Sequence, residues 1–484
     1  MKDNRTELLN TAKALGLTVY PRSPDAAEGT ACALVRGKEG KALAVLGEKA
    51  DRFAGEKREE LKLCPLTAEN AGALMELFPY TKPRSHRGRP FTFGTGDRLG
   101  LATPGHVRAM EGFEVFPVFA QQSVRELNLT GRSFSRVIAD AAFGVFQEGY
   151  RGGYGADGDH LKTREEITGA LNSGCSMITL DCSQHIDTGA GTLRGAGAEA
   201  AWAALPQDLR RHYEEAYLGN ELPVLGVLSR EELQRIVLVF WRAIRHAEDC
   251  FRHAEKTCSA PVDLELSIDE TLTVTTPAEH FVIARELAGA GIRPDSVAPH
   301  FTGTFEKGVE YAGDLKAFHR DLLVHQKIAE HFGYKLSLHS GSDKLSVFSV
   351  LGRVTGGRVH VKTAGTSWLE ALAVLAEKDP ALYRRAQHFA LDHRPEAEKY
   401  YHVSTDAKEI PDIDLMCDAY LPEYLRQPAS RQTMHIAYGL LLAEPWFREE
   451  FFALLDRQEE AHYARLQAHI AKHLRYVTEG IRQA

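Results

Sequence analysis

Residues 335–344 read Lys335-Leu336-Ser337-Leu338-His339-Ser340-Gly341-Ser342-Asp343-Lys344. Apolar side chains alternate through the first half, which predicts a buried strand, and the strand ends at a histidine followed by a polar loop. A parallel strand of this kind places an imidazole, hydroxyls, a carboxylate and an ammonium at the sheet edge where α/β proteins bind ligands. Buried polar groups cost free energy unless each finds a partner, so this stretch predicts a functional site.

The same pattern of a short apolar run with a polar or glycine end, followed by a helical stretch, recurs along the chain. We predict eight strands, at residues 99–103, 114–120, 154–159, 177–181, 262–267, 296–300, 335–339 and 359–362. Eight strands that alternate with helices predict a (β/α)8 TIM barrel of the α/β class. A doubly wound open sheet is the alternative, which periodicity alone does not exclude.

Three further regions accompany the predicted barrel. Residues 1–90 predict a small α/β region with a short helix, a hairpin from 31–36 and 42–46, and a helix near 68–77. The barrel is expected at 91–404, with an insertion at about 185–228 that forms a lid or leads into an elaborated outer helix starting after Ser229. Residues 405–484 predict a helical extension that packs on the barrel or on another subunit, the latter giving a homo-oligomer.

Composition narrows the class of protein. The chain has 44% hydrophobic and 26% charged residues and a net charge of −8, and its charges are mixed without long blocks of one sign. These values are typical of a folded domain and argue against nucleic acid or an anionic membrane as a partner. The sequence lacks the roughly 18 consecutive apolar residues of a membrane helix. The seven cysteines are dispersed and form no CxxC pair, so we expect reduced thiols in a cytoplasmic protein.

Metal-binding side chains lie at the ends of several predicted strands: His160, Asp181, Glu265, His300 and His339. Imidazoles combined with carboxylates suit Zn, Mn, Ni, Co or Fe. The wide spacing in sequence is expected because strand ends of a barrel converge on its axis. For His160 the alternative is a hydrogen bond to a loop carbonyl, and for His300 a packed structural role.

Strand phase indicates which side chains enter the barrel. In residues 262–269 the polar positions share one face, so Asp263 and Glu265 are expected to point inward. The same reasoning directs His360 and Lys362 inward. Residues 94–100 have the glycines of a phosphate loop, but they lack the Lys-Ser/Thr of a Walker motif, so nucleotide binding is not expected.

Four segments, 94–100, 156–163, 337–344 and 360–366, together resemble the tagaturonate epimerase family. The resemblance runs from about Gly94 to His402. The segment around Asp159-His160 is also similar to the Gly-Asp-His-Leu-Gly-Pro loop of tagatose-bisphosphate aldolase-type barrel proteins, although Lys162 replaces the first glycine after the leucine.

The resemblance implies a metal-dependent enzyme that interconverts tagaturonate and fructuronate in hexuronate catabolism. It implies metal ligands at His160, His300 and His339, and an acid/base pair at Asp159 and Glu265, with Glu265 alternatively a fourth ligand. For an anionic sugar substrate we expect further contacts from Arg98, Asp181, Ser340, Ser342, Asp343, Lys344 and Lys362, the three cations serving the carboxylate.

The expected chemistry is inversion of a carbon β to a ketone, where simple enolisation does not acidify the C–H bond. A retro-aldol cleavage followed by re-addition avoids that difficulty, with the divalent metal acting as a Lewis acid. Direct deprotonation is the competing mechanism. The alternative functions are a class II ketose aldolase of the tagatose-bisphosphate type, a ketose isomerase, and a noncatalytic barrel subunit of an aldolase.

Overall fold

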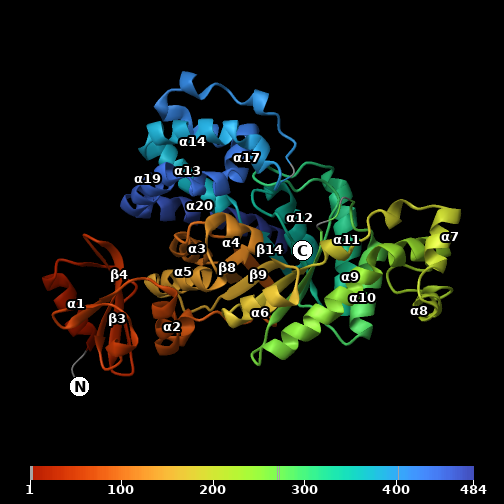
Figure 1. Cartoon of the computed structure of the whole chain (residues 1–484), viewed down its shortest axis with the longest axis horizontal. Coiled ribbons are helices and arrows are strands. Elements are labelled where there is room, and N and C mark those ends of the chain that lie inside the picture. The colour runs from red at the N-terminus through yellow and green to blue at the C-terminus, as the bar shows by residue number, and fades with distance from the viewer. Residues whose placement is uncertain (1–3, 270, 272, 402, 484) are drawn as a thin grey trace.

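The computed structural model describes residues 4–269, 271, 273–401 and 403–483. Its centre is a closed barrel of eight parallel strands, in which each strand pairs with the next in the chain and the last pairs with the first (Figure 1). The strands are β7 (Phe91–Thr95), β8 (Phe116–Ser123), β9 (Gly155–Leu161), β10 (Met177–Asp181), β11 (Asp263–Ile268), β12 (Ser296–Pro299), β13 (Lys335–Leu338) and β14 (Val359–Thr363). The predicted TIM barrel is confirmed, and the open sheet is excluded.

The first barrel strand was predicted too far along the chain. Residues 99–103 form a turn and the start of a helix, because the Asp97 carboxylate accepts the backbone N–H groups of Leu99, Gly100 and Ala102 at 2.7–3.1 Å. The strand lies earlier, at Phe91–Thr95. A side chain that binds nearby backbone groups in this way competes with strand pairing.

Helices surround the barrel in the order expected of alternating strands and helices. They are α3 (Thr103–Met110), α4 (Val124–Thr130), α5 (Phe134–Gln147), α6 (Arg164–Asn172), α9 (Arg230–Thr257), α10 (Pro277–Gly289), α11 (Leu315–Phe332) and α12 (Leu345–Thr355). The insertion before α9 contains α7 (Ala196–Ala203) and α8 (Gln207–Tyr217), both of which contact α9. They project from one side of the barrel, away from the N-terminal sheet (Figure 1).

The last helix, α20 (Glu459–Ile481), completes the ring around the barrel. It packs against α12, which follows β13, and against α3, which follows β7. It therefore lies between these two helices in the ring. Its Ile470, Leu474 and Val477 belong to the same apolar core as the barrel. Glycine permits the close crossing with α12: a Cβ on Gly352 would lie 2.1 Å from the carbonyl oxygen of Val477.

The helices between β14 and α20 form a second apolar core. The main ones are α13 (Thr366–Lys378), α14 (Pro380–Asp392), α17 (Pro428–Ile436), α18 (Tyr438–Ala443) and α19 (Pro445–Arg457). The shorter ones are α15 (Arg394–Ala397) and α16 (Leu421–Tyr424). Trp368, Tyr383 and Phe447 are buried in this core, which lies beside the barrel in Figure 1. Within the described residues, no helix has both the length and the apolar character needed to span a membrane.

The N-terminal region is an antiparallel sheet flanked by α1 (Asn4–Ala14) and α2 (Ala68–Leu77). Its strands are β1 (Thr18–Val19), β2 (Asp25–Ala27), β3 (Thr30–Gly37), β4 (Gly40–Gly47), β5 (Glu56–Arg58) and β6 (Leu61–Cys64). The β3–β4 hairpin lies where the sequence predicted it. Ion pairs from Arg36 and Lys41 to Glu459 connect this sheet to the start of α20.

Candidate active site

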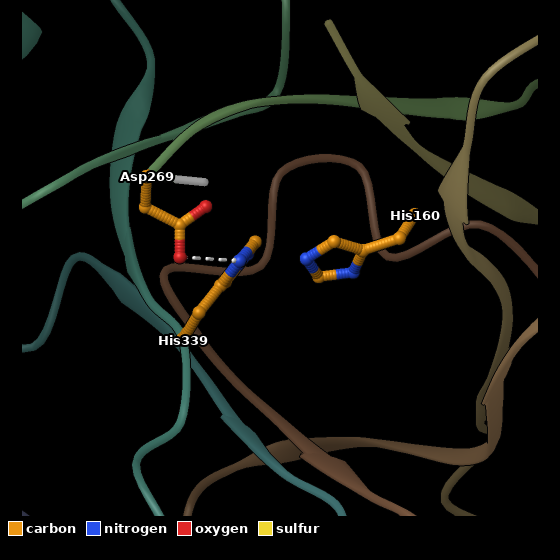
Figure 2. Close-up of side chains that lie close together, drawn as sticks. All are labelled: His160, Asp269 and His339. Atoms are coloured by element: carbon orange, nitrogen blue, oxygen red, sulfur yellow. Dashed lines mark ion pairs between the residues drawn. The ribbon is translucent and has the colours of Figure 1, made fainter. Parts of the chain in front are cut away.

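Two histidines and an aspartate converge at the carboxyl end of the barrel. His160 ends β9, Asp269 follows β11 and His339 follows β13, and each offers one ligand atom within 4.8 Å of the other two. Figure 2 shows the imidazoles of His160 and His339 facing one another, with Asp269 beside His339. Two of the three predicted metal ligands therefore lie together, joined by an aspartate that we did not select from the sequence.

Each of these histidines is held by a carboxylate on its other side. The Nε2 atom of His339 is hydrogen bonded to Glu265 Oε1 at 2.8 Å, and the Nδ1 atom of His160 to Asp159 Oδ1 at 2.9 Å. The Nδ1 atom of His339 is buried without a hydrogen-bond partner among the described residues and lies 3.2 Å from Asp269 Oδ2. Metal-binding histidines are oriented by carboxylates in this way, so the donor set fits a divalent cation.

Beneath the histidines, buried carboxylates surround Lys362. Its Nζ atom lies 2.7 Å from both Asp157 and Asp159 and 2.9 Å from Glu265. Burial lowers the pKa of Lys362, but these carboxylates outweigh burial and raise it well above its usual value. Burial raises the pKa of Glu265, yet Lys362 and His339 hold that pKa well below its usual range. Both groups are therefore charged at neutral pH.

A cavity of about 560 Å³ opens beside the histidines and joins a smaller one of about 50 Å³ that reaches Lys362. His339, Asp269 and Ser340 line both cavities. Asp159 and His160 line the smaller one, whereas Glu265 is fully buried and lines neither. Of the two carboxylates predicted as the acid/base pair, only Asp159 faces the space available to a substrate.

Two residues of the predicted site lie outside this convergence. His300 lines the large cavity, but its Nδ1 atom donates to the carbonyl oxygen of Thr271 at 3.0 Å, and it is not in the group of three. Asp181 accepts the N–H of Ser183 at 2.8 Å and lies 3.2 Å from Lys162 Nζ, and it lines neither cavity. Its carboxylate thus shapes the turn after β10.

Some side chains of the loop at residues 340–344 line the cavity, and others point into the protein interior. Ser340 and Ser342 line the smaller cavity, as expected for substrate contacts. Asp343 points away from it and receives a hydrogen bond of 2.5 Å from Arg431 on α17. Lys344 is fully buried, and its Nζ atom donates to the carbonyl oxygens of Glu306, Val309 and Ser342. Asp343 and Lys344 therefore hold loops together instead of facing a ligand.

A second group of metal-binding side chains, Asp343, His469 and His473, lies behind this loop. The Nε2 atom of His473 already accepts the backbone N–H of Asp343 at 2.8 Å, and its Nδ1 atom is bonded to the carbonyl oxygen of His469. The Nε2 atom of His469 is bonded to Thr366 at 2.9 Å. Because both imidazoles are engaged, we interpret this group as a clamp that fixes the loop to α20.

The cationic side chains at the two cavities include Arg98 and Lys362, which the sequence predicted, and two that it did not. Arg98 reaches the smaller cavity, but it pairs with Glu126 at 2.9 Å and stacks on Tyr438. Arg125 and Lys307 line both cavities, together with Tyr401. The sequence prediction missed these two cations, because neither follows a barrel strand directly in the pattern that we used.

Comparisons with known proteins agree with this architecture. The sequence profile of the tagaturonate epimerase family matches residues 20–477. A tagaturonate/fructuronate epimerase from Thermotoga maritima is 39% identical over 470 residues, covering 95% of this chain and 96% of that protein. The native crystal structure of fructuronate-tagaturonate epimerase from Cohnella laeviribosi is 44% identical, with a TM-score of 0.94, covering 98% of this chain and 99% of that one. A glycerol complex of the same enzyme matches equally well. The chain belongs to the tagaturonate epimerase family and is an epimerase, an enzyme of the isomerase class.

Proposed function

We propose that the protein interconverts tagaturonate and fructuronate, with a divalent metal, in cytoplasmic hexuronate catabolism. The observation that carries the proposal is the pair of carboxylate–imidazole contacts, Glu265–His339 and Asp159–His160, which aim both rings at Asp269 beside a cavity lined by cations. The relatives named above are epimerases of these two uronates, which supports the choice of substrate.

His160, His339 and Asp269 would hold the metal. Two nitrogen donors and one oxygen donor suit Zn, Mn, Ni, Co or Fe better than an ion that prefers oxygen alone. The bound cation supplies a Lewis acid that stabilises negative charge on substrate oxygens. His300 lines the same cavity and is available to the substrate or to the metal.

Lys307 and Arg125 are placed to bind the substrate carboxylate. Both line the two cavities, and Lys362 lines the smaller one. Lys344 fixes the loop that carries Lys307 by binding the carbonyl oxygens on either side of it, at Glu306 and Val309. This assignment replaces Lys344 and Lys362 as carboxylate-binding residues, since protein groups already saturate both of their ammonium groups.

For the inversion we propose a retro-aldol step in which Asp159 handles the proton. Asp159 takes the proton of the hydroxyl group on the carbon β to the ketone, and the bond between that carbon and its α neighbour breaks. The products are an aldehyde and an enediolate fragment. The aldehyde rotates and re-adds, and Asp159 returns the proton to the new hydroxyl oxygen. Lys362, at 2.7 Å, keeps Asp159 ionised for this role.

The decisive experiment joins metal analysis of the purified protein to NMR of tagaturonate incubated with it in deuterated water. We expect stoichiometric transition metal, formation of fructuronate, and no carbon-bound deuterium at the inverted centre. Deuterium at that carbon would refute the retro-aldol route in favour of direct deprotonation. Turnover that survives complete metal removal would refute metal dependence.

Substrate class is tested by comparing uronates with ketose bisphosphates in the same assay. We expect Lys307→Met to raise KM for the uronate about 10-fold or more, because a charge-assisted hydrogen bond contributes about 1.5–3 kcal/mol. Lys316→Met, on the exposed surface of α11, is the matched control and is expected to leave KM unchanged. A preference for the bisphosphate would favour the aldolase alternative, whereas an unchanged KM in Lys307→Met would refute the role of Lys307 in binding the carboxylate.

A further inference from the structure

A second large cavity lies at the opposite, amino-terminal end of the barrel. It has a volume of about 720 Å³ and is lined by residues that precede the barrel strands. Lys335 is the first residue of β13, and Asp295 and Arg358 come directly before β12 and β14. Its volume falls within the usual range of small-molecule sites, about 300–1,000 Å³.

The charge of this cavity is opposite to that of the chain. Its lining includes five cationic side chains but only two carboxylates, which leaves an excess of three positive charges in a protein of net charge −8. The cations are Arg87, Arg89, Arg293, Arg358 and Lys335. The four arginines are exposed, and two of their planar forks are partly engaged: Arg87 donates to the carbonyl oxygen of Val262 and Arg358 to that of Gly333. Such forks match phosphate and carboxylate oxygens in pairs.

The floor of the cavity contains a buried ammonium group that has no carboxylate within ion-pair distance among the described residues, although Asp263, Asp295 and Glu265 attract it from farther away. Lys335 is 5% exposed, and its Nζ atom is bonded to the Thr92 hydroxyl at 2.9 Å and the Arg89 carbonyl oxygen at 3.2 Å. No carboxylate of the described chain forms an ion pair with Lys335 within 4.0 Å. Burial lowers the pKa of Lys335 to about 8. A buried charge left unpaired is costly, so an anion in the cavity would be stabilising.

The two carboxylates of the cavity do not neutralise this floor. Asp295 Oδ2 accepts the backbone N–H of Leu264 at 2.9 Å, and its Oδ1 atom lies 3.6 Å from Arg87 Nε. Glu255 is exposed near the end of α9. Asp263, deeper in the barrel, accepts from Ser85 and from the backbone of His86. Asp295 and Asp263 therefore bind groups of the surrounding chain.

We propose that this cavity, here called the amino-terminal anion site, binds a small polyanion such as a phosphorylated metabolite or a polycarboxylate. An excess of three positive charges favours a ligand with several anionic oxygens over a sugar acid with one carboxylate. The site lies at the opposite end of the barrel from His339, so its occupant is distinct from the substrate. The proposal does not depend on the reaction assigned above.

The test is calorimetric titration of the full-length protein with pyrophosphate and, separately, with citrate. A chelator is present throughout, so that neither anion binds through a metal at the other end of the barrel. We expect saturable binding of at least one probe, weakened by added salt. We expect Arg293→Gln/Arg358→Gln to bind that probe at least 10-fold more weakly. Arg211→Gln/Arg448→Gln, which removes two exposed arginines outside the cavity, is expected to bind it as the wild type does.

Binding of pyrophosphate alone supports a phosphorylated ligand, binding of citrate alone supports a polycarboxylate, and binding of both supports recognition by charge. The proposal is overturned if neither anion binds, or if the Arg293→Gln/Arg358→Gln variant binds as tightly as the wild type. An equal loss in the control variant would also overturn it, because the effect would then reflect overall charge. Epimerase turnover, measured on the same variants with added metal and without chelator or either anion, tests the proposed function separately.

Discussion

Replacing Glu265 with glutamine separates two roles that this carboxylate can have. Glu265 is fully buried, and its Oε1 atom is bonded to His339 Nε2 at 2.8 Å, while its Oε2 atom accepts the Ser296 hydroxyl. Glutamine keeps the shape but removes the charge. If Glu265 orients His339, then Glu265→Gln weakens metal binding and leaves kcat nearly intact once the metal saturates the site.

The size of the effect follows from the hydrogen bond that changes. A charge-assisted bond contributes about 1.5–3 kcal/mol and a neutral one about 1 kcal/mol, so the loss is about 0.5–2 kcal/mol. That loss corresponds to a metal affinity lower by roughly 2- to 30-fold. The loss of carboxylates that orient metal-binding histidines elsewhere lowers affinity about 10- to 100-fold. We therefore expect a decrease of about 10-fold.

The assay is competition with a chelator of known affinity, followed by activity measured across free metal concentrations. Asp263→Asn is the matched control, because Asp263 is buried two residues earlier on the same strand but contacts Ser85 and His86 instead of His339. It is expected to bind metal as the wild type does. Wild-type affinity in Glu265→Gln would refute the orienting role. Activity that saturating metal does not restore would instead assign Glu265 to proton transfer.

Three further predictions follow from other contacts. His339→Ala is expected to abolish metal binding and turnover while far-ultraviolet circular dichroism stays unchanged; full activity at limiting metal would show that the site is wrong. Lys344→Met leaves three carbonyl oxygens without their donor. We therefore expect kcat/KM to fall about 10-fold and amide hydrogen exchange to become faster at residues 303–310. Lys316→Met is the control. At Glu459, burial raises the pKa but Lys41 outweighs it and brings the value to about 2, below the ordinary 4.5. The resulting stabilisation, about 3 kcal/mol, is complete above pH 4.5 and is lost as the pH falls towards 2, so Glu459→Gln is expected to flatten the acid limb of a stability–pH curve. An unchanged acid limb, or an equal effect of Glu460→Gln, would contradict this reasoning.

The barrel was predictable because its strands are short apolar runs that alternate with helices. The turn at Asp97 misled the assignment of the first strand, since residues 99–103 are as apolar as a strand, but the carboxylate binds the backbone locally. The sequence predicted a helical extension that packs on the barrel or on another subunit, but it did not predict where in the ring α20 lies. Its place between α12 and α3 depends on packing between segments more than 100 residues apart, which no local pattern encodes.

The site was predictable to the extent that it follows strand phase. Asp263, Glu265 and Lys362 enter the barrel because their apolar neighbours must meet the outer helices. Asp269 lies on the same alternating face as Glu265 but comes after the last residue of β11. The alternation therefore placed Asp269 on the inward face, but we assigned it no role. Lys307 had no such signal, because the loop that carries it is held by residues distant in sequence, among them Lys344, Arg431 and Gln432.

The backbone at the mouth of the barrel shows how the C-terminal helices contribute to the candidate site. His160, Ser340 and Asp343 have φ angles of 54°, 50° and 61°, in the left-handed region that costs residues other than glycine about 1–2 kcal/mol each. Such conformations persist only where surrounding contacts impose them. At Asp343 those contacts come from Arg431 on α17 and from His473 on α20, which accepts the Asp343 N–H. The loop after His339 is therefore held in place by residues outside the barrel, and the C-terminal helices help to position a loop whose Ser340 and Ser342 line the smaller cavity.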